Sequence, residues 1–125
     1  MALQWEQIVV DAQDAGRLAR WWAEALGGWV IVTDQPDEVE IRKSPDQLPG
    51  LLFTPVPEAK TVKNRLHIDL RPDDQEAEVE RLIDMGARHA DVGQGSDVTW
   101  VVLADPEGNE FCVLSSKPLP PDEAN

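Results

Sequence analysis

Two halves of the sequence share one order of predicted elements, and this internal duplication constrains the fold more than any other feature. In each half a short run of strand formers precedes an amphipathic helical pattern that ends at a glycine, Gly27 in the first half and Gly86 in the second. Sliding one half over the other sets QIVVD (7–11) against HIDLR (67–71). Each half alone would leave one face of its sheet bare. The sequence therefore predicts an α+β fold built from two βαβββ modules.

The predicted elements are bounded by capping and turn residues. Asp14 is a good N-cap for the first helix, and Asp73 with Glu76 three residues later fits a capping box for the second. Pro and Asp residues separate the short strands that follow each helix. The predicted strands cover residues 5–10, 29–33, 38–42 and 50–54 in the first half, and 65–70, 87–92, 98–104 and 110–115 in the second.

The length of 125 residues suits one compact domain. We expect a single domain over 1–125, with module one at 1–57 and module two at 65–116. The polar, proline-bearing segment 58–64 is typical of a linker, and the proline-rich, acidic tail 117–125 is predicted to be disordered.

The charge balance narrows the classes of partner. With 24 acidic and 11 basic residues, the formal net charge is −13, which repels phosphate backbones and anionic lipids. We therefore expect neither nucleic-acid nor membrane binding. The same charge would favour a cationic ligand, although its more common meaning is a well-solvated surface.

Two further features concern the cellular compartment. Cys112, the single cysteine, lies in an apolar strand-like run, where a thiol usually behaves as a small hydrophobic group. The first 30 residues contain no uninterrupted apolar stretch and so predict neither a signal peptide nor a membrane span. A cytoplasmic protein is the expectation.

Two sequence motifs indicate a protein family as well as a fold. In DPEGNEFCV (105–113), Asp and Pro start a turn, Gly108 suits a positive φ, and a strand begins at Glu110. Together with NRLHID (64–69), this motif resembles the vicinal oxygen chelate superfamily, which includes glyoxalase I, extradiol dioxygenases and bleomycin-resistance proteins. The resemblance covers Trp5 to Ser116. It implies a cup-shaped mixed sheet with the helices packed outside, a small-molecule ligand, and no nucleotide cofactor.

The resemblance also implies metal ligands. The superfamily places them at the positions of His67, Glu110 and Gln7, so these three form the predicted set for a divalent ion such as Zn, Ni, Mn or Fe. Glyoxalase I has a further acid on the fourth strand of module one, but the position here is Leu52. Glu110 and Asp69 are the candidate catalytic residues, with Asp69 as the candidate base.

Each candidate also has a simpler interpretation. His67 can be a pocket histidine with a hydrogen-bonded neighbour, although Asp69 lies two residues along the strand, too far to be assumed as that neighbour. Glu110 can be a hairpin carboxylate that accepts turn amides. Strand alternation places Val9 on the face of Gln7, and Trp5, Val9 and Trp100 are the predicted substrate-binding residues, although core positions are equally compatible with the two tryptophans.

Two functions remain open at this stage. The first is a metal-dependent lyase or isomerase that acts on a small oxygenated substrate. The alternative is a metal-free binding protein that sequesters a cationic aromatic compound, as bleomycin-resistance proteins do. For either function the resemblance predicts a homodimer.

Overall fold

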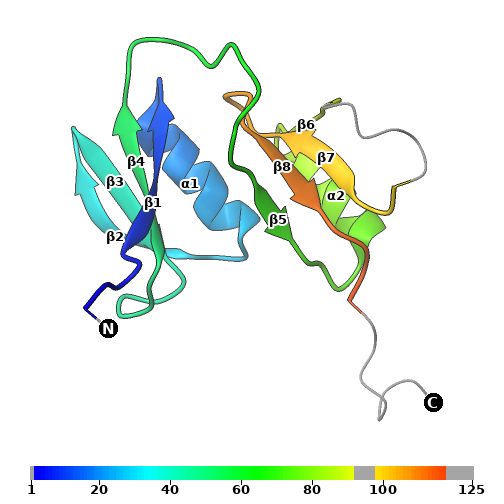
Figure 1. Ribbon diagram of the computed structural model, residues 1–125, viewed down its shortest axis with the longest axis horizontal. Coiled ribbons are helices and arrows are strands. Elements are labelled where there is room, and N and C mark those ends of the chain that lie inside the picture. Colours follow the sequence, from blue (N-terminus) through cyan, green and yellow to red (C-terminus); the bar gives the residue numbers. More distant parts are fainter. Residues whose placement is uncertain (1, 92–97, 118–125) are drawn as a thin grey trace. The chain divides into compact units, whose positions relative to one another are not determined.

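The computed structural model describes residues 2–91 and 98–117, and the chain forms two compact units. Unit 1 extends to Ala59 and unit 2 starts at Lys60. Each unit contains a strand, a helix and three further strands, in that order (Figure 1). The predicted α+β fold with two βαβββ modules is confirmed.

Unit 1 is a four-stranded sheet with a helix on one face. Its sheet order is β1-β4-β3-β2; β1 is parallel to β4, and the other neighbours are antiparallel. Helix α1 lies against β3 and β4. The elements are β1 (Gln7–Ala12), α1 (Ala15–Ala25), β2 (Val30–Gln35), β3 (Glu38–Arg42) and β4 (Gly50–Pro55).

The predicted start and stop of α1 are confirmed. The Asp14 side chain accepts a hydrogen bond from the Arg17 amide at 3.2 Å, which satisfies one of the free amides of the first turn. After the helix, Gly27 has a φ of 85°, a conformation that costs a residue with a Cβ atom. Leu18 and Trp22 are buried on the face of α1 that packs on the sheet.

Unit 2 repeats the topology with shorter strands. Its sheet order is β5-β8-β7-β6, with β5 parallel to β8 and the other neighbours antiparallel. Helix α2 lies against β8. The elements are β5 (Ile68–Leu70), α2 (Gln75–Asp84), β6 (Arg88–His89), β7 (Val101–Ala104) and β8 (Glu110–Val113).

Several predicted boundaries in unit 2 were wrong. Strand β5 begins at Ile68 instead of residue 65, and Leu66 is exposed. The N-cap of α2 is Asp74, whose side chain accepts from the Ala77 amide at 3.2 Å, so Asp73 does not form the predicted capping box. Among the described residues, the strand predicted at 87–92 covers only Arg88–His89, and the strand predicted at 98–104 begins at Val101. Residues 92–97 and the tail 118–125 lie outside the described residues.

Each unit has its own apolar core between helix and sheet. Phe53 of β4 is fully buried in unit 1, and Phe111 of β8 is almost fully buried in unit 2. Neither of the helices that the structure describes is long and apolar enough to span a membrane.

Candidate functional site

The DPEGN turn sets the position of β8. Asp105 is fully buried, and its Oδ1 accepts the amides of Glu107 and Asn109, both at 2.9 Å. The Asn109 side-chain amide donates to Oδ2 of the same carboxylate at 3.0 Å. Gly108 adopts the predicted positive φ, 90°. This turn therefore fixes where β8 begins, which is at Glu110 as predicted.

Glu110 is held by two donors from the segment before β5. Its Oε2 lies 2.6 Å from the Lys60 ammonium, and its Oε1 accepts the backbone amide of Asn64 at 2.8 Å. The two charged side chains are 18% and 15% exposed. Burial opposes ionisation of Glu110, but the hydrogen bonds from Lys60 and Asn64 and the charge of Lys60 outweigh it, so the pKa of Glu110 lies below its usual value.

His67 and Asp69 form an ion pair, with Nε2 of the imidazole 3.2 Å from Oδ1 of the carboxylate. The expectation that Asp69 was too far away was wrong. His67 precedes β5 and is not part of it, so strand spacing does not separate the two side chains. Both are about half exposed, at 47% and 50%.

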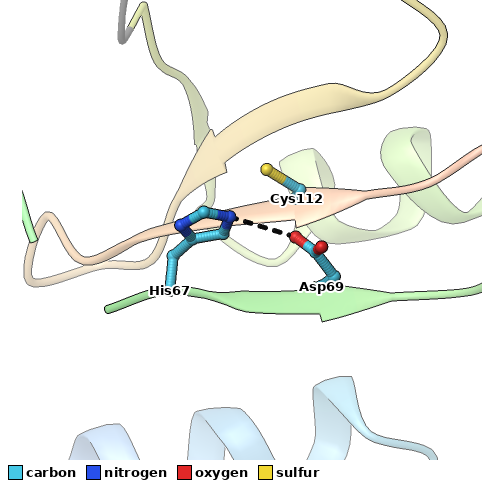
Figure 2. A group of neighbouring side chains, drawn as sticks. All are labelled: His67, Asp69 and Cys112. Atoms are coloured by element: carbon cyan, nitrogen blue, oxygen red, sulfur yellow. Dashed lines mark ion pairs between the residues drawn. The ribbon is translucent and has the colours of Figure 1, made fainter. Parts of the chain in front are cut away.

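Cys112 lies directly beside Asp69, because Asp69 and Cys112 are register partners in the parallel β5–β8 pair. Its side chain is buried, and this burial raises the pKa of the thiol; the charge of Asp69 and a hydrogen bond to it act in the same direction. The three side chains rise from the same side of the paired strands (Figure 2). One ligand atom from each of His67, Asp69 and Cys112 lies within 4.8 Å of the others.

The remaining predicted residues are divided between the units. Gln7 opens β1 in unit 1, where it pairs with Gly50 of β4. Trp5 and Val9 are exposed in unit 1, and Trp100 of unit 2 is 38% exposed, so these three are available to a ligand. Leu52 lies beside Val9 on β4, which leaves the fourth strand of unit 1 without an acid at that place.

Sequence reasoning missed the two partners of Glu110. Lys60 and Asn64 fell in the predicted linker, and no local pattern connects them to a carboxylate near the end of the chain. Cys112 was interpreted as a structural residue; it is buried, and it also lies beside Asp69. Alternation along the predicted strands 65–70 and 110–115 puts His67 with Asp69, and Glu110 with Cys112, on single faces; it does not give the β5–β8 register, which puts Asp69 against Cys112.

The metal that the fold implies does not fit Glu110 in this arrangement. An ion at Oε2 would have to displace the Lys60 ammonium, which already neutralises the carboxylate, and the other oxygen accepts the Asn64 amide. The group formed by His67, Asp69 and Cys112 offers nitrogen, oxygen and sulfur donors and fits a divalent ion better.

Comparison with protein families gives a match over nearly the whole chain. The sequence profile of the family described as "Glyoxalase-like domain" matches residues 7–114. A search of curated protein sequences found no significant match.

Solved structures with a similar fold come from several kinds of protein. A glyoxalase/bleomycin resistance protein/dioxygenase family enzyme from Burkholderia phytofirmans PsJN is 16% identical, with a TM-score of 0.66 over 90% of this chain and 98% of that one. A bleomycin resistance determinant encoded on transposon Tn5 is 17% identical, with a TM-score of 0.59 over 93% and 100%. The trypanothione-dependent glyoxalase I of Leishmania major is 14% identical, with a TM-score of 0.66 over 91% and 87%. At these identities the likeness shows the fold alone.

Proposed function

The chain belongs to the glyoxalase-like domain family, and we propose that it binds a cationic aromatic small molecule without a metal ion on Glu110. The observation that carries the proposal is the 2.6 Å pair between Lys60 and Glu110. An internal ammonium group stands where the family resemblance would put a metal ion, so the Glu110 carboxylate is already neutralised.

Charge and exposed indoles support a cationic, flat ligand. The net charge of −13 raises the local concentration of cations. Trp100 and Trp5 are exposed in their respective units, and an indole face attracts a cation and stacks on an aromatic ring. One of the structures with the same fold is a bleomycin resistance determinant, which is consistent with a binding function on this scaffold.

Metal-free bleomycin is a suitable probe, used with a chelator so that metal chemistry does not contribute. We expect it to quench tryptophan fluorescence with a Kd in the micromolar range, and the affinity to fall as salt is added. Trp100→Ala should weaken binding about tenfold, which corresponds to one stacking or cation–π contact.

The anionic dye anilinonaphthalene sulfonate is the matched control, and we expect it to bind more weakly than bleomycin. Equal binding of both probes would contradict a site selected by charge. No bleomycin binding by folded, chelated protein at any salt concentration would overturn the proposal.

A second candidate function is a metal-dependent lyase or isomerase that uses Glu110 and Asp69. The ion pair of His67 with Asp69 favours it, because a half-exposed carboxylate held beside an imidazole is suited to proton transfer. This function requires a metal ion that displaces the Lys60 ammonium from Glu110 and is also bound by His67, so metal uptake would be lost in both His67→Ala and Glu110→Gln. Retained uptake in Glu110→Gln would exclude this ligand set.

The family resemblance also supports a homodimer as part of the proposal. Light scattering across a wide concentration range measures the molar mass directly. We expect twice the chain mass of 13.9 kDa, and a monomer at every concentration would contradict the dimer.

A further inference from the structure

We propose that unit 2 carries a zinc site whose protein ligands are His67, Asp69 and Cys112. This site goes beyond the proposed binding function, which needs no metal, and it does not include Glu110. The two proposals therefore stand or fall separately.

The β5–β8 register builds the site. Asp69 and Cys112 are directly paired across the two parallel strands, so their side chains emerge side by side on one face. His67 lies just before β5 and turns its imidazole toward Asp69, to 3.2 Å. All three ligand atoms are within 4.8 Å of one another, and Figure 2 shows them on the same side of the strands.

The distances need only a small adjustment to hold an ion. Zinc bonds of about 2.0–2.3 Å in a tetrahedral site place the ligand atoms roughly 3.3–3.8 Å apart. Cys112 is fixed by its burial, but His67 and Asp69 are half exposed and can rotate. Closing the group requires a movement of about one ångström at these two side chains.

The donor set selects the metal class. A thiolate sulfur together with an imidazole nitrogen and a carboxylate oxygen suits zinc better than Mg²⁺ or Ca²⁺, which prefer oxygen ligands. When zinc binds, the Cys112 thiol releases its proton to solvent as the Zn–S bond forms. The thiolate and the Asp69 carboxylate then carry two negative charges, which balance the ion.

The half-exposed side chains leave the site accessible to a metal ion from solvent. The half-exposed His67 and Asp69 side chains form its outer side, and the buried Cys112 forms its inner side. Three protein ligands leave a fourth position open to water or a small molecule, which is the arrangement of reactive rather than purely structural zinc sites.

Cobalt substitution tests the ligands spectroscopically. The purified full chain, reduced and stripped with a chelator, is titrated with Zn²⁺ for stoichiometry and with Co²⁺ for absorption. We expect one ion per chain, visible bands of tetrahedral Co²⁺, and a near-ultraviolet sulfur-to-cobalt charge-transfer band. Cys112→Ala should remove the charge-transfer band. Asp69→Asn and His67→Gln should each weaken zinc binding by at least about tenfold. Even residues that only orient metal ligands contribute about tenfold to a hundredfold to affinity.

Matched controls lie in the same unit. His89 on β6 is exposed and offers a second imidazole, and Glu110 on β8 offers a carboxylate two residues from Cys112. His89→Gln and Glu110→Gln should leave stoichiometry and spectrum unchanged. Asp69→Asn changes a half-exposed side chain, so it tests the site even if Cys112→Ala folds poorly, and circular dichroism checks the fold of each variant.

Three results would overturn the proposal. The first is no uptake of Zn²⁺ or Co²⁺ by folded wild-type protein. The second is cobalt uptake without a sulfur charge-transfer band. The third is uptake that survives Cys112→Ala and Asp69→Asn but disappears in Glu110→Gln, which would place the metal at the family's position instead.

Discussion

The two units share one topology but differ at the pair of parallel strands that each places side by side. Aligning β1 and β4 with β5 and β8 by their register sets Val9 and Leu52 of unit 1 against Asp69 and Cys112 of unit 2. Unit 1 therefore carries an apolar pair where unit 2 carries two metal-ligand types. The backbone that brings these positions together is common to both units, so the chemistry resides in the side chains.

The two units also differ at the residue that opens their last strand, which is Gly50 in unit 1 and Glu110 in unit 2. In unit 1, Glu40 is buried and receives two hydrogen bonds from Arg42, two residues away on the same strand. Gly50 opens β4 as Glu110 opens β8, and a Cβ on Gly50 would lie only 2.5 Å from Oε2 of Glu40. In unit 1, the Glu40–Arg42 ion pair therefore occupies the space that a side chain at residue 50 would need.

The largest effect should come from matched deletions in the two cores. Phe53→Ala and Phe111→Ala each remove a buried ring, and each should lower the free energy of unfolding by about 3–5 kcal/mol. Urea unfolding followed by tryptophan fluorescence and circular dichroism measures both. Costs that differ by more than about 2 kcal/mol would show that the two cores are not equivalent.

Gly50→Ala should have the next largest effect. The added methyl group would meet Oε2 of Glu40 at 2.5 Å and the Ile41 carbonyl oxygen at 3.0 Å, and overpacking of this kind costs about 1–3 kcal/mol. Gly16→Ala is the control, since its methyl group meets only the flexible end of Arg20; because Gly16 lies in α1, we expect no loss of stability and a gain of up to about 1 kcal/mol from helix propensity. Equal effects of the two substitutions in thermal unfolding would refute the tight packing at Gly50.

Breaking the Lys60–Glu110 ion pair should lower stability somewhat less than Gly50→Ala does, and the loss should depend on pH. Glu110→Gln removes the charge that Lys60 neutralises, and we expect a loss of about 1–2 kcal/mol at pH 7. Because the pKa of Glu110 is lowered in the folded state, its contribution is present above the unfolded value of about 4.3 and is lost as the pH falls through the folded pKa.

The difference between wild type and Glu110→Gln should therefore shrink below about pH 4. Urea unfolding at a series of pH values measures it, with the exposed Glu80→Gln as a control expected to change stability by less than about 0.5 kcal/mol. A difference that stays constant down to pH 3 would contradict the lowered pKa.

The smallest effect, weak Co²⁺ binding, is expected when the zinc ligands are transplanted to unit 1. This experiment is also the sharpest test of the comparison between the units. Gln7→His, Val9→Asp and Leu52→Cys together copy the zinc ligands onto the equivalent register of unit 1. In a background that carries His67→Gln, Asp69→Asn and Cys112→Ala, we expect weak Co²⁺ binding with a sulfur charge-transfer band. A folded transplant without this band would show that strand register alone does not build the site.

The sequence predicted those features that local chemistry controls. Asp14 caps α1, Gly27 follows its end, and Glu110 opens β8, because each of these depends on residues a few positions away. The contact between Lys60 and Glu110 was not predictable, since it joins a loop to a strand 50 positions later. Alternation gives the face of each residue but not its neighbour on the next strand, so the group of His67, Asp69 and Cys112 appeared only with the register.

The parallel pairing of β5 with β8 has a consequence for the order of folding. The first strand of unit 2 must wait for the last strand before its edge is paired, so Asp69 stays apart from Cys112 until almost the whole unit has left the ribosome. Cys112 itself lies on β8, so its thiol becomes available only when this last strand has been made. In the cell, metal would therefore bind after β8 has paired with β5, and it would not guide that pairing. Pairing of the last strand is the step that completes the site.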